Sequence, residues 1–192
     1  MGRAKKFDPD VAVERAVDAF RVRGYGETSP QELADRMGIG KGSLYHAFGS
    51  KHELFLKSLE HYADQSLAEL KAVMEGPEPI RDRVRRLLES FVDADLRDPD
   101  RCGCLIVNSV AELHDREDPA SRFLGRSLEN SESVIRTALV AAQAAGEIDA
   151  DRDPAALAGL VQAAMVGLRV LVKTTDDRAR LALIVDATVQ TL

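Results

Sequence analysis

The two cysteines, Cys102 and Cys104, carry the most reactive side chains of the sequence. They stand two positions apart, directly after Arg101 and just before a stretch expected to be helical. Because backbone N–H groups at a helix N-terminus and a neighbouring cation both stabilise a thiolate, the pair could form a redox or electrophile sensor in which Cys102 resolves an oxidised Cys104. The alternative is that Cys104 is a small buried apolar residue and Cys102 is incidental, as is common for free cysteines.

Other kinds of chemistry find less support in the sequence. Two cysteines this close cannot form the disulfide framework of a secreted protein, so a cytoplasmic location is the simpler expectation. Nearby His114 and Asp115 supply no recognisable ligand spacing, and we expect no metal and no cofactor. The pair lacks C-x-x-C spacing, and the sequence has no nucleophile elbow, phosphate loop or His-x-x-x-His motif. An enzyme, for example a thiol oxidoreductase, is therefore the weaker alternative.

The composition favours an all-α fold. The chain has 192 residues, no tryptophan and 45% hydrophobic residues, many of them Ala, Leu and Val, which suits helices that pack on helices. Its net charge of −6 argues against a wholly basic nucleic-acid-binding protein. Residues 1–57 nevertheless carry ten Lys or Arg against eight Asp or Glu, whereas the remainder carries 16 against 24. Only the N-terminal part could therefore approach a polyanion without strong repulsion.

Residues 29–51 have the pattern of two short helices joined by a tight turn. Ser29 can cap the first helix, and the proline that follows occupies the first helical position, where its missing N–H costs nothing. Gly38 suits the left-handed position that ends this helix. A second helix is expected at about residues 40–47, and Ser50 can cap a third. This arrangement predicts a helix-turn-helix unit. The helix expected before it is capped by Asp8 and ends at Gly24.

The residues that carry a family resemblance lie at fixed spacing in and around this unit. They are Phe20, Gly24, Tyr25, Thr28, Leu33, Ala34, Gly38, Ile39, Lys41, Gly42, Ser43, Leu44, Tyr45, His46, Phe48, Ser50, Lys51, Leu54 and Phe55. In these residues the sequence resembles the N-terminal signature of the TetR/AcrR family of transcriptional regulators. The resemblance implies an all-α fold of about nine helices. A helix-turn-helix DNA-binding domain at residues 1–50 would pack on a helical-bundle ligand-binding and dimerisation domain at residues 51–192.

The resemblance also implies which residues contact a double-stranded DNA operator. The helix that begins near Gly40 would enter the major groove, with small residues near its start allowing close backbone approach. The expected DNA-binding residues are Thr28, Gln31, Lys41, Gly42, Ser43, Tyr45, His46 and Lys51. The alternative is a core aromatic residue for Tyr45 and a solvated imidazole for His46. A basic arm at residues 1–7 would either reach the DNA or be a frayed terminus.

The rest of the chain has the apolar periodicity of long helices. We expect helices at about residues 50–75, 80–96, 105–113 and 118–145, and a mainly apolar pocket between them for a small-molecule effector. Its expected lining is Leu59, Tyr62, Leu88, Phe91, Leu105, Asn108, Ser109 and Phe123. For Asn108 and Ser109 the alternative is that their side chains simply point to solvent.

The last two expected helices, from residue 154 onward, carry few charges and many small residues. They cannot be solvated all round, so we expect them to pair with a second copy around a two-fold axis, unless both bury all their apolar faces within one chain. The expected dimer residues are Gly159, Ala163, Val166, Gly167, Leu183 and Ala187. The apolar stretch at residues 157–172 is too short to span a bilayer and contains Gln162 and Arg169, so we expect no membrane partner.

Taken together, these patterns predict a homodimeric transcriptional regulator. A small apolar or amphipathic ligand would release it from its operator, which favours a repressor over an activator. Sensing through Cys104 and Cys102 is the alternative input.

Overall fold

The computed structural model describes residues 7–113 and 118–192, and this part of the chain forms nine α-helices without a β-strand. The basic arm up to residue 6, and His114 with Asp115, lie outside the described residues. The helices are α1 (Pro9–Glu27), α2 (Pro30–Met37), α3 (Lys41–Phe48), α4 (Lys51–Met74), α5 (Ile80–Arg97), α6 (Leu105–Glu112), α7 (Pro119–Ala144), α8 (Pro154–Leu171) and α9 (Arg178–Gln190). The expected all-α fold is confirmed.

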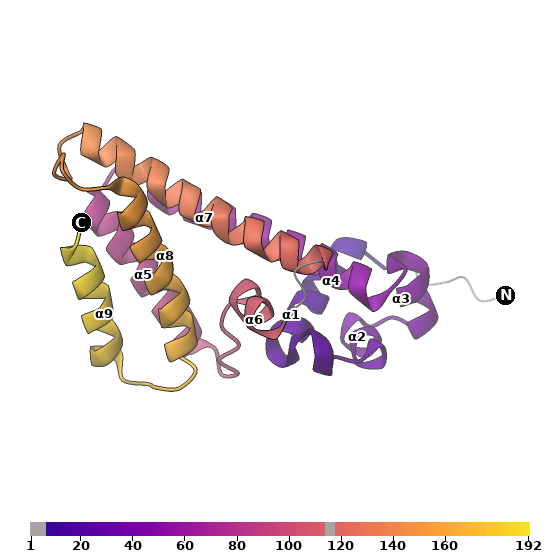
Figure 1. Cartoon of the computed structure of the whole chain (residues 1–192). Helices are drawn as coiled ribbons and strands as arrows, with labels where there is room; N and C mark the ends of the chain where they lie inside the picture. The colour runs from indigo at the N-terminus through magenta and orange to yellow at the C-terminus, as the bar shows by residue number, and fades with distance from the viewer. Residues whose placement is uncertain (1–6, 114–117) are drawn as a thin grey trace.

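The molecule is elongated, with its first helices at one end and its last helices at the other (Figure 1). Helices α1, α2 and α3 form the end that carries the N-terminus, and α5, α8 and α9 form the opposite end. Helices α4 and α7 run between the two ends and pack against each other. This arrangement places the helix-turn-helix unit on a surface far from α8 and α9.

The capping residues explain why the short helices begin and end where they do. The Ser29 hydroxyl accepts from the backbone N–H of Glu32 at 3.1 Å, and the Ser50 hydroxyl accepts from the N–H of Glu53 at 3.0 Å. Gly38 ends α2 with a φ of 70°, a left-handed conformation that glycine adopts without a Cβ clash. The helix-turn-helix geometry predicted from these residues is confirmed.

Helix α1 departs from the expected boundary. The sequence predicts an end at Gly24, whereas the helix resumes after a kink at this residue, where φ is 81° and ψ is 173°. Because the kink interrupts the helical hydrogen bonds, it exposes the N–H groups of Tyr25 and Gly26 to other partners. The hydroxyl of Thr28 closes the kink by donating to the carbonyl of Gly24 at 2.5 Å.

Two clusters of buried side chains hold the helices together. The first core cluster joins α1, α2 and α3 to the first turns of α4, to α6 and to the start of α7, with Phe20, Leu44 and Phe55 among its members. The second core cluster joins the end of α4 to α5, α8, α9 and the rest of α7. The predicted boundary after residue 50 therefore falls at the start of a helix that belongs to both clusters.

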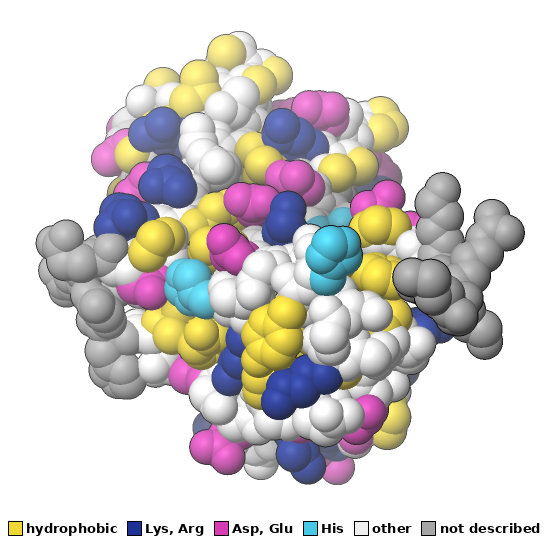
Figure 2. Space-filling view, turned by 90° about the vertical axis from the view of Figure 1, so that its right-hand side faces the viewer, with side chains coloured by type: hydrophobic (Ala, Val, Ile, Leu, Met, Phe, Trp, Pro, Cys, Tyr) yellow, Lys and Arg dark blue, Asp and Glu magenta, His cyan; other side chains and the backbone are white. Residues whose placement is uncertain are grey.

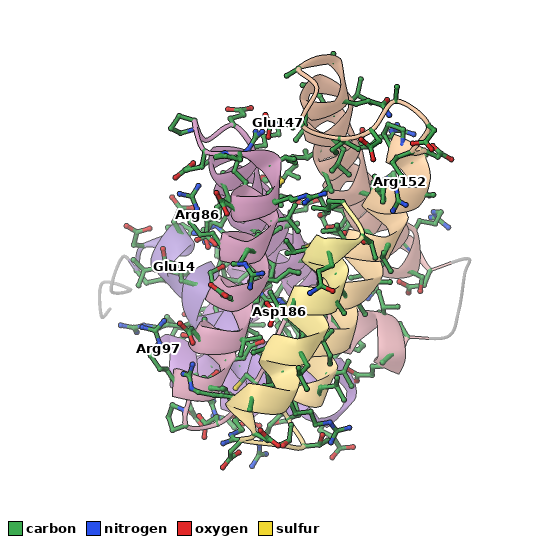
Figure 3. The ribbon with its side chains drawn as sticks, turned by 90° about the vertical axis from the view of Figure 1, so that its left-hand side faces the viewer. Glu14, Arg86, Arg97, Glu147, Arg152 and Asp186 are labelled. Carbon is green, nitrogen blue, oxygen red and sulfur yellow. The ribbon has the colours of Figure 1, made fainter. Side chains whose placement is uncertain are left out.

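Polar contacts join the helices of the second cluster. The guanidinium of Arg85 on α5 donates to the Asp186 carboxylate on α9 at 2.5 Å, and Figure 3 shows Asp186 on the side of α9 that faces α5. On α8, the Arg169 guanidinium lies 3.3 Å from the carboxylate of Asp95, which is 3% exposed. Burial raises the pKa of Asp95, and the nearby Arg169 guanidinium acts in the opposite direction.

The outer surface of α8 and α9 remains apolar. Leu160 and Val170 of α8 are 42% and 48% exposed, and Leu183 of α9 is 68% exposed. The expectation that the apolar stretch at residues 157–172 is too short to span a bilayer is corrected: among the described helices, α8 is the one whose length and composition would suffice to cross a bilayer, and 22% of this helix is buried. The core helix of a soluble protein passes the same test, so α8 is only weak evidence for a membrane span.

Candidate nucleic-acid interface and internal cavity

Helix α3 presents one face to the core and the other to solvent. Leu44 and Phe48 are buried in the first core cluster, and this packing fixes the rotation of the helix. Lys41, Tyr45 and His46 therefore lie on the outer side, with Tyr45 40% exposed. The exposed face combines a cation, a phenol and an imidazole, all of which can donate to phosphate oxygens.

Gly42 lies on this exposed face and has no structural reason to be glycine within the chain. A Cβ at this position would meet no atom within 4 Å, and the residue has no unusual φ. Glycine inside a helix costs about 0.5–1 kcal/mol relative to alanine. The absence of a side chain at Gly42 is thus consistent with close approach by something outside the chain.

The structure corrects the expectation for Thr28 and places Gln31 and Lys51 beside internal partners. Thr28 is fully buried and its hydroxyl donates to Gly24, so this side chain is not available for the expected phosphate contact. The Gln31 amide donates to the carboxylate of Asp35 at 2.9 Å but stays exposed. The Lys51 ammonium lies 4.4 Å from the centre of the Tyr25 ring, and its burial lowers its pKa.

Among residues 7–113 and 118–192, the side chains at the end of the molecule that carries α3 do not form a strongly basic surface. Figure 2 shows Lys and Arg side chains mixed with Asp, Glu and apolar side chains, and histidines near the middle of the view. Glu32, for example, lies 3.2 Å from the guanidinium of Arg23 and 3.6 Å from that of Arg36. Attraction to a polyanion therefore depends on a few positioned contacts, in agreement with the small positive charge of this part of the sequence.

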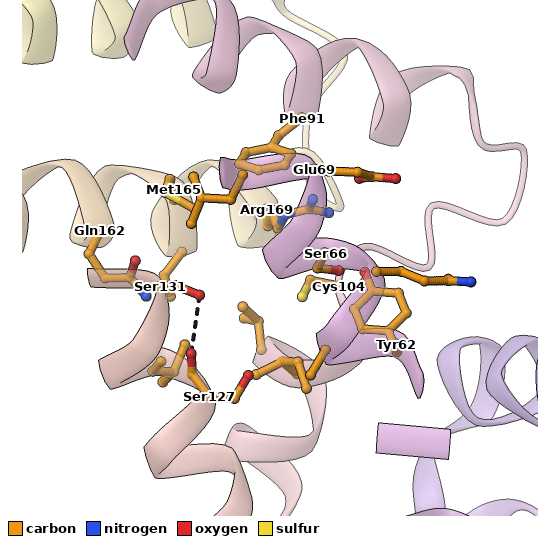
Figure 4. A pocket seen from close by; sticks show the side chains of 17 residues that line it. Tyr62, Ser66, Glu69, Phe91, Cys104, Ser127, Ser131, Gln162, Met165 and Arg169 are labelled. Atoms are coloured by element: carbon orange, nitrogen blue, oxygen red, sulfur yellow. Dashed lines mark hydrogen bonds between the residues drawn. The ribbon is translucent and has the colours of Figure 1, made fainter. Parts of the chain in front are cut away.

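A cavity of about 170 Å³ lies between α4, α5, α6, α7 and α8 (Figure 4). Tyr62 and Glu69 line it from α4, and Gln162 and Arg169 line it from α8. Apolar side chains such as Phe91 complete the wall, and the Arg169 guanidinium lies 4.1 Å from the centre of the Phe91 ring. The cavity is thus amphipathic, whereas the sequence predicted a mainly apolar pocket, because Glu69, Gln162 and Arg169 add polar and charged groups to the wall.

Tyr62 and Phe91 are the expected ligand-binding residues that line this cavity. Six others lie elsewhere. Leu59, Leu88 and Leu105 are buried core residues, Ser109 is buried, Phe123 packs against the first core cluster, and Asn108 makes structural hydrogen bonds. The Asn108 amide donates to the carbonyl of Cys102 at 2.7 Å and its oxygen accepts from Lys173 at 2.5 Å. These six residues therefore hold the surrounding helices rather than the cavity surface.

The expected lining lacked the residues of α7 and of α8 that face the cavity, although the sequence contains a pattern that indicates them. Gln162 and Arg169 are seven positions apart, so they share one face of the otherwise apolar α8. Ser127 and Ser131 have the matching four-residue spacing on α7, where the Ser131 hydroxyl donates to the carbonyl of Ser127 at 3.1 Å. Polar residues at helical spacing inside apolar helices indicate a shared polar interior, and here they face one cavity.

The two cysteines occupy different environments. Cys104 lines the cavity together with Tyr62, whose pKa is raised first by burial and further by this neighbouring thiol. Cys102 is buried and forms no disulfide bond. Burial, followed by the carboxylate of Asp98, raises the pKa of the Cys102 thiol above its usual value. The Cys102 thiol is therefore not activated.

Asp98 and Asp100 lie close to Cys102, and their possible ligand atoms are within 4.8 Å of one another. Asp98 is already engaged, because it accepts from the backbone N–H of Cys102 at 3.3 Å and lies 3.6 Å from Arg21. Asp98 is thus held by the loop backbone and by Arg21 of α1, and the group supplies no argument for a metal.

Two polar contacts connect the walls of the cavity to the helix-turn-helix unit. Glu112, at the end of α6, accepts from the N–H of Tyr25 at 2.8 Å and from the N–H of Gly26 at 2.5 Å. These are the N–H groups that the kink at Gly24 exposes. Arg21 of α1 donates to the carbonyl of Gly103 at 3.1 Å, just before α6 begins. Sequence reasoning missed both contacts, because their partners are more than 80 positions apart.

A helix-turn-helix with an exposed second helix, attached to a helical bundle that encloses a cavity, defines a DNA-binding regulator of the one-component type. Two family models match the chain: "Bacterial regulatory proteins, tetR family" at residues 12–57, and "Tetracyclin repressor-like, C-terminal domain" at residues 81–188. The chain belongs to the TetR family of transcriptional regulators. It is therefore a DNA-binding transcriptional regulator and not an enzyme.

Similar proteins agree with this assignment. The uncharacterised regulator YezE of Bacillus subtilis is 32% identical over 194 residues, and the match covers 100% of each chain. A cysteine variant of the TetR family regulator CifR, solved with a 26-bp double-stranded operator DNA, is 34% identical, with a TM-score of 0.87 over 98% of each chain. The transcriptional repressor ComR of Escherichia coli is 26% identical over 88% of this chain and 81% of its own.

Proposed function

We propose that two copies of the chain form a cytoplasmic homodimeric repressor, and that a small apolar or amphipathic molecule in the cavity releases it from its operator. The observation that carries this proposal is the double role of α4. Tyr62 and Ser66 of this helix line the cavity, whereas Leu54 and Phe55 near its start lie in the core that supports α3. A ligand that displaces α4 therefore acts directly on the DNA-binding end.

The proposed DNA contacts follow from the placement of α3. Its N-terminal end, with Lys41, Gly42 and Ser43, would enter the major groove, while Tyr45 and His46 contact the phosphate backbone. Gln31 and Lys51 would add phosphate contacts from the starts of α2 and α4. Thr28 is left out because its hydroxyl is used inside the fold.

The dimer is proposed on the outer face of α8 and α9. Along α8, Leu160, Ala163, Gly167 and Val170 recur at helical spacing on one side, and all four are at least partly exposed. Leu183 and Ala187 have the same relation on α9. The predicted Gly159 also lies partly exposed on α8, whereas Val166 lines the cavity. A second copy related by a two-fold axis would cover these apolar side chains with the same face of its own.

The physical basis of release is a difference in ligand affinity between two conformations. A ligand that binds the DNA-bound and the free conformations equally well cannot change operator affinity, however tightly it binds. In this chain, α6 and α4 both contact the cavity and the first core cluster. A rearrangement of these two helices around a ligand would change the position of α3 relative to its symmetry mate.

Repression, rather than activation, is proposed from the effect of operator occupation on transcription and from similar proteins. A protein that occupies an operator and is displaced by a ligand blocks transcription until the ligand arrives. ComR is described as a repressor, and a structure of CifR holds operator DNA. We therefore favour repression over activation.

A selection of operator sequences from a random duplex library would test DNA reading and release together. The selected duplex should bind the wild-type protein, and log K should fall linearly with log salt concentration. Lys41→Ala should weaken binding of the selected duplex, because it removes a cationic side chain from the major-groove end of α3. Lys51→Ala, which removes a proposed phosphate contact, should lower the salt slope by about 0.9. Lys71→Ala, which removes an exposed lysine from the far part of α4, is the matched control.

Compounds that raise the melting temperature in a small-molecule screen should then release the selected duplex. An unchanged affinity of Lys41→Ala would contradict the proposed interface. Stabilising compounds that never weaken operator binding would contradict the proposed release.

One observation favours a second candidate input. The Cys104 thiol lines the cavity, so an electrophile that enters could form a bond between the sulfur and its carbon, with departure of a leaving group or opening of a strained ring. A resolving role for Cys102 gains no support from its buried, unactivated thiol. If operator release by an alkylating agent persists in Cys104→Ser, this candidate is wrong; Cys102→Ser is the matched control.

A further inference from the structure

The charges around the cavity point to the chemical class of its ligand. Arg169 is the cationic lining residue, and its guanidinium already lies 3.3 Å from the carboxylate of Asp95. Asp95 is 3% exposed, so water molecules cannot easily take the place of the arginine as its hydrogen-bond partner. A carboxylate ligand that took over Arg169 would leave a buried charge without its partner, which is strongly unfavourable. The exposed carboxylate of Glu69 on the same cavity would repel it further.

The hydrogen-bonding groups of the cavity also favour a neutral ligand. The side-chain oxygen of Gln162 is shielded from solvent and has no hydrogen-bond partner among the described residues. Gln162 lines the cavity together with Ser127 and Ser131 (Figure 4). A buried amide oxygen without a donor is costly, so a ligand that supplies an O–H or N–H group gains affinity there. Because a hydroxyl or an amide both donates and accepts, it can pair with either end of the Gln162 amide.

The size of the cavity limits the rest of the ligand. Its volume is about 170 Å³, only slightly more than an apolar cavity of about 150 Å³ that holds one benzene molecule. The apolar part of the wall includes Leu70, Phe91 and Met165. A compact apolar body of the size of one aromatic ring fills such a space.

We infer that the effector is a small neutral molecule with a compact apolar body and one hydroxyl or amide group that pairs with Gln162, and that carboxylates of the same size are excluded. This inference rests on the proposed function, in which the cavity is the effector site. It assigns Gln162 as the residue that determines specificity. The ion pair of Arg169 and Asp95 acts as a fixed part of the wall.

Matched aromatic probes test the inference directly. Benzyl alcohol, benzamide, toluene and benzoate have similar sizes and differ in charge and hydrogen bonding. Calorimetric titration of the wild-type dimer should show binding of benzyl alcohol or benzamide, weaker binding of toluene, and no binding of benzoate at the same concentration. Loss of the pairing in Gln162→Met should reduce the preference for benzyl alcohol over toluene by about 5- to 100-fold.

Two controls keep the test decisive. Gln190→Met makes the same replacement at an exposed position of α9 and should bind like the wild type. Circular dichroism should show that Gln162→Met keeps its helical content; if it does not, Gln162→Leu removes the same amide and should reduce the preference for benzyl alcohol over toluene in the same way.

Binding of benzoate as tight as that of benzyl alcohol, an unchanged preference in Gln162→Met, or no binding of either neutral probe at about 10 mM would each overturn the inference. The proposed function is read out separately, by operator binding in the presence of the probe. If benzoate binds and releases the operator, the ligand class is wrong and the proposed function stands. If benzyl alcohol binds selectively without any effect on the operator, the ligand class stands and the proposed release is wrong.

Discussion

Replacement of Glu112 by glutamine tests whether α6 holds the helix-turn-helix unit through the kink in α1. The two carboxylate oxygens accept from the N–H groups of Tyr25 and Gly26, at 2.8 and 2.5 Å. Glutamine keeps one acceptor and presents an NH₂ group to the other N–H, so one charge-assisted hydrogen bond disappears and the remaining one becomes neutral. The fold leaves room for this interaction, because a Cβ at Gly24 would lie 2.7 Å from the Glu112 carboxylate.

The size of the effect follows from these two bonds. A hydrogen bond to a charged group contributes about 1.5–3 kcal/mol, and partial replacement by water at the exposed Gly26 reduces the net loss to about 1–2 kcal/mol. This loss should accelerate amide hydrogen exchange at Tyr25 and Gly26 by about 5- to 25-fold. It should also lower the melting temperature by about 2–8 °C, given about 2–4 °C per kcal/mol for a chain of this size.

Hydrogen exchange measured by NMR or by mass spectrometry of the peptide around residue 25 is the assay. Glu129→Gln, which makes the same change at an exposed position of α7, should leave exchange at Tyr25 and Gly26 unaltered. If the proposed coupling operates through this contact, Glu112→Gln should also reduce the effect of a ligand on operator affinity. Unchanged exchange at Tyr25 and Gly26 in Glu112→Gln would refute the role assigned to Glu112.

Three further predictions concern the dimer face, the buried thiol and the DNA-facing glycine. Leu183→Glu should weaken the dimer by about 30- to 700-fold, because about 1–2 kcal/mol of burial disappears in each copy, while Val110→Glu on α6 should not; sedimentation equilibrium distinguishes them. Since burial and the Asp98 carboxylate raise the pKa of Cys102, its alkylation by iodoacetamide should be slower than that of the unfolded chain at pH 7.5 and should keep increasing to a higher pH than in the unfolded chain. Fast labelling of Cys102 at pH 7.5, read by mass spectrometry, would show that the thiol is activated. Gly42→Ala should stabilise the fold by about 1 kcal/mol but weaken operator binding, and equal operator affinity would show that close approach at this position is not needed.

The sequence predicted the helices well because their ends are determined by neighbouring residues. The hydroxyl of Ser29 and the left-handed Gly38 act within one turn of the chain, so their type and spacing suffice. The boundary in α1 was predicted wrongly because it depends on a residue that is distant in the sequence. Gly24 does interrupt the helix, with a φ of 81° and a ψ of 173°, but a distant residue, Glu112, binds the N–H groups beyond it and helps the chain to continue.

The cavity could be predicted only in part, because it depends on how distant helices pack. Tyr62 and Phe91 were assigned to it from periodicity, yet Asn108 was assigned for its polarity alone and is instead bound to the Cys102 carbonyl and Lys173. A local sequence pattern cannot predict that the partner is Lys173, which lies 65 positions away. The polar pair on α8 was visible in the sequence, but its meaning depends on which helix faces it.

The central claim is that occupation of the cavity and occupation of the operator are coupled, and the two affinities of one ligand test it most directly. The measurement is a calorimetric titration of the most stabilising compound from the screen into the free dimer and into the dimer saturated with selected operator DNA. The account predicts that the operator weakens ligand binding at least ~5-fold, and that the ligand weakens operator binding by the same factor, as thermodynamic linkage requires. Equal ligand affinity with and without operator DNA would contradict it.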